Sequence, residues 1–483
     1  MTDAPDIVFI ITDQQRYDTI ATLGASHMDT PNIDRLARTG VNFSQCHVTA
    51  PSCVPCRASL FTGYYPHTNG VLANGQPWSR TWVSDLANAG YHCVNIGKMH
   101  TIPYDAKAGF HERYVVENKD RYMEGRWFFD EWDKALASHG LKKQQREEYR
   151  KRDDYRDRLG AFTWDLAPKL QSDNFVGDTA CWWLETKPVE KPLFLVVGFP
   201  GPHPPYDPTP ELAQKYMDRD VPVPDVSDAE LADLAGPWVE KRQHDVDVDH
   251  DSVAWKLDPT PEELHRMRAY YYANVEMIDT QVGRILDRLE ARGNMDNTIV
   301  IFTSDHGDNL GDHGLVQKWA PYEEVTRVPL IISAPNRFKA GQVDALVQLF
   351  DLGPTILEWA GVTPDPTYEA ISLNPALQGE TFAGRDHVFC EQAGDVNMTG
   401  ASFLTMVRSP THKLVHFRNS DEGQLFDLTS AAGETKNLWD DPGAAEVKQA
   451  LLQRMLEFHI ESTMHTRNAR RLIVSPAGAE ALQ

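Results

Sequence analysis

Four short apolar segments of this chain each lead into a cluster of polar residues. Apolar runs of this length are typical of strands buried on both faces of a parallel sheet. In open α/β sheets, the binding crevice lies outside the carboxyl ends of the strands. The pattern therefore predicts that the polar side chains after these strands meet at one edge of a mostly parallel sheet. The segments are residues 7–12, 91–96, 193–197 and 298–303, and they lead to Asp13, Lys98, His203 and Asp305 in that order.

Helical patterns separate the predicted strands, and a different pattern follows them. Residues 30–37, 84–87, 269–292 and 344–361 have the spacing or the turn residues of helices. Further on, short runs with turn residues between them predict a small antiparallel sheet, with a helix at about 443–462 packed on it. The fold class is therefore α/β: a mostly parallel sheet flanked by helices, with a smaller C-terminal antiparallel sheet plus helix. The runs predicted as strands of the smaller sheet are residues 387–391, 403–408, 412–417 and 424–428.

The length of the chain predicts more than one folding unit. Its 483 residues exceed the size at which a single hydrophobic core stops growing. We expect a main domain at residues 1–370, with insertions at about 103–190 and 208–261, and a C-terminal α+β subdomain with a tail at 371–483. The tail is predicted as an arm that reaches a neighbouring subunit of a homo-oligomer, or as a disordered end.

The net charge and the apolar content exclude two broad classes. The formal charge is −23, from 47 Lys and Arg residues against 70 Asp and Glu residues, which argues against a general nucleic-acid binder. No apolar run approaches the roughly 20 residues of a membrane span. The short acidic start lacks the features of a secretory leader, so we expect a cytoplasmic protein with reduced cysteines.

Two highly charged segments are predicted to be solvated. Residues 141–159 are dense in charge, as in a solvent-exposed helix. Residues 245–251 resemble the start of an EF-hand loop, but His250 replaces the required glycine and Lys256 stands at the twelfth position. A solvated acidic loop is therefore the better interpretation than a calcium site.

The segment around Cys53 combines a sulfur, a rigid turn and a fixed cation. Pro55 suits the first turn of a helix, and Gly63 is placed to end it. Cys53 would then lie where backbone N–H groups attract anions, with Arg57 one turn further on. We interpret Cys53 as the site of a covalent nucleophile. A redox pair with Cys56, or half of a zinc site, stays an alternative, although the other cysteines do not supply a second pair at zinc spacing.

A divalent metal is indicated by the polar residues after two of the strands. Asp13 and Asp305 supply carboxylates, with Gln14 and His306 beside them. Oxygen ligands with one imidazole suit one Ca²⁺ or Mn²⁺, and Zn²⁺ stays open. The alternative is that each aspartate caps a helix.

Two motifs resemble the signatures of type I sulfatases, which belong to the alkaline phosphatase superfamily. Cys53, Pro55 and Arg57 form the Cys-x-Pro-x-Arg signature, and residues 90–100 resemble the second signature, with Cys93 where Ser or Thr is usual. The resemblance implies an alkaline phosphatase-like fold. It also implies that a maturation enzyme converts Cys53 to Cα-formylglycine, which then acts as the nucleophile.

The resemblance also assigns roles to further residues. Lys98 and Lys318 would bind the sulfate group, His100 would take a proton from the nucleophile, and His203 would lie close to the leaving-group oxygen. Asn74 is a candidate substrate contact. The four metal-site positions match the family's ligands, but Gln14 and His306 depart from its commonest pattern and resemble phosphonate monoester hydrolases and some sulfatases of the same superfamily. The sequence therefore predicts these site residues: catalytic Cys53, Arg57, Lys98, His100, His203 and Lys318, substrate-binding Asn74, and metal-binding Asp13, Gln14, Asp305 and His306.

The resemblance implies hydrolysis of small-molecule sulfate esters. Aryl or small alkyl sulfate monoesters would react through a covalent formylglycine–sulfate intermediate. One alternative is a phosphonate monoester or phosphate diester hydrolase that uses the same site. The other is a non-catalytic binding protein in which Cys53 is unmodified.

Overall fold

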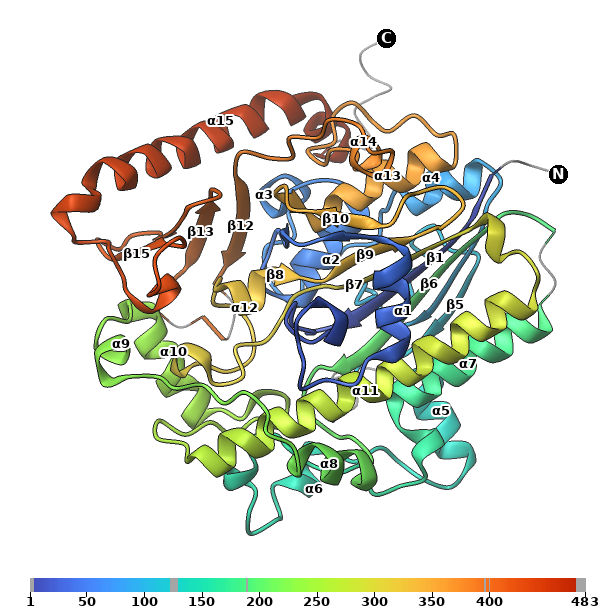
Figure 1. The fold of residues 1–483 in the computed structure, drawn as a ribbon, viewed down its shortest axis with the longest axis horizontal. Helices are drawn as coiled ribbons and strands as arrows, with labels where there is room; N and C mark the ends of the chain where they lie inside the picture. Colours follow the sequence, from blue (N-terminus) through green and yellow to red (C-terminus); the bar gives the residue numbers. More distant parts are fainter. Residues whose placement is uncertain (1–3, 122–128, 188–189, 395–396, 399, 475–483) are drawn as a thin grey trace.

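The computed structural model describes residues 4–121, 129–187, 190–394, 397–398 and 400–474, with side chains up to Arg467. Within these residues, the central sheet has eight strands in the order β10-β2-β9-β7-β1-β6-β4-β5 (Figure 1). β9 runs antiparallel to both of its neighbours, and the other pairs are parallel. The strands are β1 (Asp6–Asp13), β2 (Val41–Phe43), β4 (His92–Gly97), β5 (Glu112–Val115), β6 (Leu193–Pro202), β7 (Thr298–Ser304), β9 (Leu330–Ser333) and β10 (Gly341–Val343). The predicted mostly parallel sheet is confirmed.

Alternation along β1 explains why helices cover both faces of this sheet. Ile7, Phe9 and Ile11 pack into one apolar cluster, and Val8 and Ile10 pack into another. Successive side chains of a strand point to opposite faces, so a fully apolar run has to be buried on both. One cluster is completed by α2 (Cys53–Thr62), α4 (Val83–Asn88) and α13 (Leu352–Trp359), and the other by α1 (Pro31–Thr39), α7 (Ser172–Thr186) and α11 (Pro261–Ala291).

The carboxyl ends of the central strands lie at the same edge of the sheet. β1 pairs with β6 on one side and with β7 on the other, so that Asp13 is in register with Pro202 and Thr12 with Ser304. β4 follows on the far side of β6 and ends at Gly97, opposite Gly198. The residues that follow these strands therefore start side by side.

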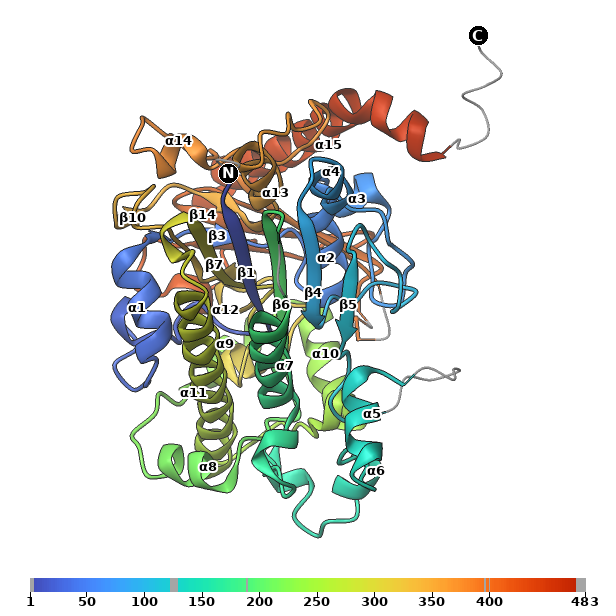
Figure 2. The same cartoon turned by 90° about the vertical axis from the view of Figure 1, so that its right-hand side faces the viewer.

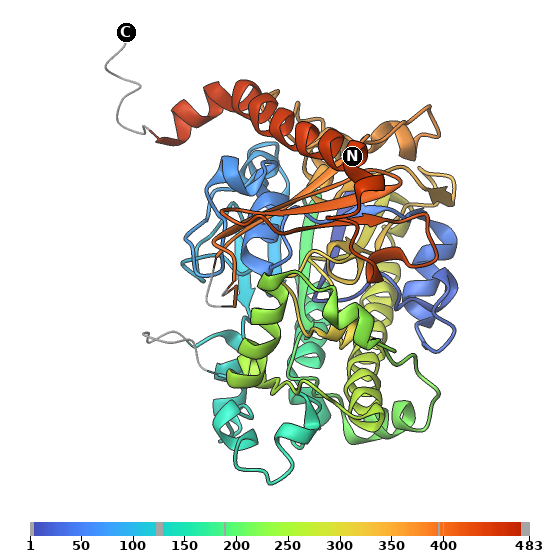
Figure 3. The ribbon, with the colours of Figure 1, turned by 90° about the vertical axis from the view of Figure 1, so that its left-hand side faces the viewer.

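The C-terminal subdomain is built on a second sheet. It contains β12 (Val388–Ala393), β13 (Phe403–Arg408), β14 (His412–Phe417) and β15 (Gly423–Asp427), all antiparallel. The four predicted strands are confirmed. The helix predicted at 443–462 is α15 (Ala445–Val474), which extends further and lies across the sheet (Figure 3). The tail residues 475–483 lie outside the described residues.

Each face of the small sheet buries a different apolar cluster. Phe389, Val407 and Leu414 face α15, whereas Met406 and Phe417 face the main domain. The sheet is thus held between α15 and the main domain, as a strand pattern with two apolar faces requires. The main domain contributes Trp238, Trp319 and Tyr322 to the second cluster, and Tyr65 and Phe350 to the first.

The remaining elements are short. A three-stranded sheet has the order β11-β3-β8, with β3 (Cys46–His47), β8 (Arg327–Val328) and β11 (Val347–Gln348). The region predicted as a helix at 344–361 starts with β11 and a 3-10 turn, and its α-helical part is α13. The other helices are α3 (Pro66–Asn69), α5 (Glu131–Ser138), α6 (Arg146–Tyr149), α8 (Pro210–Met217), α9 (Asp228–Ala232), α10 (Gly236–Asp247), α12 (Glu323–Thr326) and α14 (Asn374–Leu377). None of the helices that the structure describes is long and apolar enough for a bilayer span.

The expected insertion at 103–190 has two parts. Its ends supply β5 and α7, which belong to the central sheet and to the helical layer on it. Its middle supplies α5 and α6, which lie beyond the carboxyl ends of the strands (Figure 2). The proposed domain division at residue 370 stays a prediction.

The two charged segments are partly exposed to solvent, as predicted, but they also form ion pairs with each other. Of residues 141–159, α6 is the α-helical part, and its Arg146 lies 3.5 Å from Asp251. Arg150 donates to Asp249 over 2.7 Å, and Asp245 is buried against Lys241. The two segments therefore neutralise each other through ion pairs between distant parts of the sequence. We call residues 141–159 and 245–251 together the charged cover.

Gly63 allows a test of how α2 ends. It adopts the left-handed conformation with φ of 76°, and an added Cβ would come within 2.9 Å of the Tyr368 ring. Gly70 has φ of 80° with open space around it. Gly70→Ala should cost about 1–2 kcal/mol through its backbone alone, and Gly63→Ala should cost more because of the ring. Thermal unfolding of both variants checks this, and equal losses of Tm would contradict it.

Candidate active site

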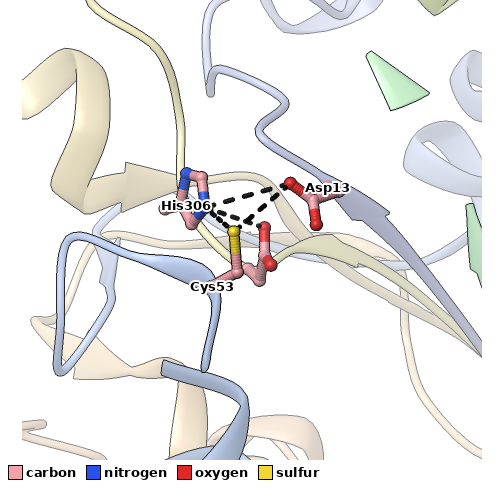
Figure 4. A group of neighbouring side chains, drawn as sticks. Asp13, Cys53 and His306 are labelled. Atoms are coloured by element: carbon pink, nitrogen blue, oxygen red, sulfur yellow. Dashed lines mark hydrogen bonds and ion pairs between the residues drawn. The ribbon is translucent and has the colours of Figure 1, made fainter. Parts of the chain in front are cut away.

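The predicted nucleophile, Cys53, and the predicted metal ligands meet at the carboxyl edge of the sheet (Figure 4). The Cys53 Sγ lies 3.2 Å from the His306 Nε2 and 3.7 Å from the Asp13 Oδ1. Ligand atoms of Asp13, Cys53, Asp305 and His306 all lie within 4.8 Å of one another, and all four residues are buried. Segments separated by about 250 residues in the chain thus form one site.

The start of α2 holds Cys53 and Arg57 in place. Ser52 is extended before the helix, and the Asn74 Oδ1 accepts a hydrogen bond from the Val54 N–H at 3.2 Å. This bond satisfies one of the N–H groups that a helix leaves unpaired in its first turn. Asn74, predicted as a substrate contact, therefore acts here on the helix that carries Cys53. The left-handed Gly63 ends the helix, as predicted.

Arg57 is fully buried and joins the two predicted metal carboxylates. Its Nε donates to the Asp305 Oδ2 at 2.7 Å, and its Nη2 lies 3.4 Å from the Asp13 Oδ2. Its Nη1 donates to the Lys98 carbonyl at 3.1 Å. The planar guanidinium group is suited to such a set of fixed acceptors. Arg57 therefore fixes the relative position of the ends of β1 and β7.

The residues of this site fit a divalent cation. The His306 Nδ1 contacts the Gly307 carbonyl at 2.9 Å, so this nitrogen carries the proton and Nε2 presents a lone pair to the carboxylates. Burial lowers the pKa of His306, but Asp305 and the Cys53 sulfur outweigh this and raise it above its ordinary value. The groups around Nε2 thus favour a positive charge at this nitrogen, which a proton or a bound cation would supply. Gln14, with φ of 71°, places its backbone N–H 3.1 Å from the Asp305 Oδ1.

Two lysines bring positive charge to the same point. The Lys98 Nζ lies 2.7 Å from the Asp13 Oδ2, and the Lys318 Nζ lies 3.0 Å from both the Cys53 Sγ and the Gln14 Oε1. Burial alone would raise the pKa of Asp13, but Lys98, followed by His203 and Lys318, holds it well below its ordinary value. Both lysines therefore face the position from which a nucleophile would act.

The two predicted histidines lie beside this group. The His203 N–H donates to the Asp13 carbonyl, and its ring Nδ1 lies 2.8 Å from the Pro204 carbonyl. Burial and Lys318 hold the pKa of His203 well below its usual value. Burial and Lys98 do the same for His100, whose Nδ1 has no hydrogen-bond partner within the part of the chain that the structure describes. Burial therefore disfavours the protonated form of both rings.

Three acidic residues at the site were not predicted from the sequence. Asp308 accepts from the Gln14 side chain at 2.7 Å, Asp251 lies 3.5 Å from the His203 Nε2, and Glu117 accepts from the His100 N–H at 3.1 Å. Asp308 follows Asp305 in the same polar cluster, which was the signal that could have found it. Asp251 lies in the charged cover, where we expected a solvated loop.

Comparison with known proteins gives the class. A family model described as "Sulfatase" matches residues 5–362, and one described as "N-sulphoglucosamine sulphohydrolase, C-terminal" matches residues 311–461. An arylsulfatase of Clostridium perfringens is 31% identical over 458 residues, with 90% of each chain covered. A choline-sulfatase of Rhizobium meliloti is 27% identical, with 93% of this chain and 85% of that protein covered. A solved phosphonate monoester hydrolase from Silicibacter pomeroyi has a TM-score of 0.79 at 26% identity, and the match covers 95% of this chain and 96% of that one.

The class is that of alkaline phosphatase-like hydrolases. Within it, the chain belongs to the sulfatase family and is a sulfuric ester hydrolase. The resemblance inferred from the two sequence signatures is thereby confirmed, as is the predicted fold class.

Asp308 gives a test of how Gln14 is oriented. Its Oδ2 accepts from the Gln14 Nε2 at 2.7 Å and from the Tyr206 hydroxyl at 2.8 Å. Asp308→Asn would place an amide donor where Gln14 needs an acceptor, and we expect metal affinity to fall about 10–100-fold. Metal titration of activity measures this. Tyr206→Phe removes the other donor and should change the affinity less, so an equal loss in both variants would contradict this role.

Glu117 predicts a pH dependence of stability. Burial raises its pKa to about 7, against the smaller opposite effects of Arg113 and Lys98. Between about pH 4.5 and 7 the unfolded chain has released this proton and the folded chain still holds it, so stability falls with rising pH by roughly 3 kcal/mol in total. Glu117→Gln lacks this loss. Its stability relative to the unmutated protein should therefore increase as the pH rises from 4.5 to 7. Denaturant unfolding at pH 4.5 and 7.5 tests this, and a pH-independent difference would contradict it.

Proposed function

We propose that this enzyme hydrolyses aryl or small alkyl sulfate monoesters, with Cys53 converted to formylglycine and one divalent metal bound beside it. The observation that carries the proposal is the surroundings of the Cys53 Sγ, which lies 3.0 Å from Lys318, 3.2 Å from His306 and 3.7 Å from Asp13. A thiol in that position is the precursor, and its Sγ marks where an aldehyde oxygen would lie. Asp13, Gln14, Asp305 and His306 would hold the metal, for which Ca²⁺ or Mn²⁺ is the proposed ion.

The proposed chemistry depends on positive charge around one tetrahedral anion. When present, the metal would supply a Lewis acid and the hydrated aldehyde at position 53 would supply an oxygen nucleophile. The ammonium groups of Lys98 and Lys318 would bind the sulfate oxygens and stabilise charge that develops on them. Arg57 would keep both carboxylates in position while this charge changes.

The two histidines would move protons. An anionic substrate offsets the repulsion from Lys318 and so favours a proton on the His203 Nε2, which would pass to the leaving-group oxygen. Asp251, 3.5 Å from this nitrogen, favours the same protonated form. Burial and Lys98 lower the pKa of His100, which favours its neutral form, so His100 would accept a proton from the nucleophile.

The named relatives support a small substrate. The arylsulfatase and the choline-sulfatase carry the names of small sulfate esters, and both matches extend over nearly the whole chain. The maturation enzyme as a partner, the cytoplasmic location and oligomerisation through the tail belong to the same proposal and rest on the sequence alone.

Intact mass and turnover test the proposal together. Co-expression with a formylglycine-generating enzyme should lower the mass by about 18 Da through oxidation of the cysteine. Hydrolysis of 4-nitrophenyl sulfate should appear in the same preparation and be lost on chelation of the metal. Cys53→Ala should show neither the mass decrease nor the hydrolysis. The matched control, Cys56→Ala, should show both. A chain that stays unmodified and inactive would favour a non-catalytic binding protein.

A phosphonate monoester hydrolase is the second candidate. Gln14 and His306 at the metal site favour it, as does the likeness to the hydrolase from Silicibacter pomeroyi. Lys98 and His100 favour sulfate ester hydrolysis, because they match the residues that the sulfatase resemblance assigns to sulfate binding and proton transfer. The ratio of kcat/KM for 4-nitrophenyl sulfate to that for a 4-nitrophenyl phosphonate decides between them. We expect the ratio to exceed one, and a large advantage for the phosphonate would reverse the assignment.

A further inference from the structure

A second cluster of metal-ligating side chains lies outside the active site. His67 of α3, Glu391 of β12 and His459 of α15 place one nitrogen or oxygen each within 4.8 Å of the others. The His67 Nδ1 lies 2.7 Å from the Glu391 Oε2, and the His459 Nε2 lies 3.8 Å from the Glu391 Oε1. The cluster joins the main domain to the C-terminal subdomain.

A chain of hydrogen bonds fixes which nitrogen of His67 carries a proton. The Ser462 hydroxyl donates to the Glu369 carboxylate, which only accepts. The same hydroxyl oxygen lies 2.6 Å from the His67 Nε2, so Nε2 has to be the donor. In a neutral ring, Nδ1 is then a lone-pair acceptor, and it faces another acceptor, the Glu391 Oε2. Either a proton or a metal ion must therefore lie between the two atoms.

A proton on Nδ1 would satisfy only part of the cluster. It would pair with the Glu391 Oε2 but leave Oε1, which is buried and has no hydrogen-bond partner among the described residues. The His459 Nε2 is too far from Oε1 for a hydrogen bond, yet two ligands of one tetrahedral Zn²⁺ lie about 3.3 Å apart. A metal ion would therefore satisfy both histidines and both carboxylate oxygens after shifts of about half an ångström.

We propose that His67, Glu391 and His459 form a second metal site, which binds Zn²⁺ or a similar divalent transition metal. Two imidazoles and one carboxylate are a ligand set that suits Zn²⁺ and disfavours Ca²⁺. Ser462 and Glu369 supply the outer hydrogen bonds that orient a histidine ligand. The His459 side chain is 37% exposed, so water completes the coordination from the solvent side.

This site would stabilise the junction between the two domains. Its ligands come from three elements, and Phe458, next to His459, packs on both Tyr65 and Phe389. Binding to the folded chain alone raises stability by mass action. We expect Zn²⁺ to raise the Tm by roughly 2–4 °C without taking part in hydrolysis.

Zinc content in the presence of excess Ca²⁺ tests the site. The mature enzyme is dialysed against micromolar Zn²⁺ with millimolar Ca²⁺, which favours oxygen-rich sites, and bound metal is measured by mass spectrometry. The unmutated chain should bind one more Zn²⁺ than His459→Gln, and its Zn²⁺-dependent rise in Tm should be absent from that variant. His465→Gln, a histidine six residues further along α15, should behave as the unmutated chain.

Activity separates this site from the catalytic metal. His459→Gln should keep its kcat for 4-nitrophenyl sulfate in Ca²⁺, because the residue lies outside the active site. Glu391→Gln should also lose the second Zn²⁺, and if that buried change prevents folding, the partly exposed His459 variant decides alone. Equal zinc content and equal Tm shifts in the unmutated chain and His459→Gln would overturn the proposal and leave a proton-shared His67–Glu391 pair.

Discussion

The active site depends on the ion pairs that Asp13 and Asp305 form with the buried guanidinium group of Arg57. Two carboxylates at the ends of neighbouring parallel strands repel each other strongly when water is excluded. Arg57 donates to both, and Lys98 contacts Asp13. In a chain with net charge −23, this edge of the sheet therefore gathers cationic side chains, which a small anion needs in order to bind.

The sequence predicted the residues whose position follows from strand direction. Asp13 and Asp305 came directly after apolar runs, and parallel neighbours bring such ends together whatever lies between them. Long-range ion pairs left no comparable pattern. The charge of residues 141–159 and of residues 245–251 predicts solvated surface within each segment, whereas in the fold Arg146 and Asp251 compensate each other. The cluster of His67, Glu391 and His459 was missed for the same reason, since 324 residues separate the first two.

The charged cover places Asp251 beside His203. Asp251 contacts His203 on one side and is paired with Arg121 and Arg146 on the other. Its backbone has a left-handed φ of 51°, a conformation that is strained for a residue with a side chain and is kept only where the surroundings enforce it. The leaving group of a substrate would therefore meet a fixed acidic group beside the proposed general acid.

The C-terminal subdomain contacts the start of the helix that carries Cys53 as well as the core of the main domain. Gln392 accepts from the Ser52 hydroxyl at 2.6 Å, immediately before Cys53, and Lys413 donates to the Pro321 carbonyl three residues after Lys318. Glu391, the neighbour of Gln392 in β12, contacts α3 and α15. The same strand thus links the start of α2 to the C-terminal helix.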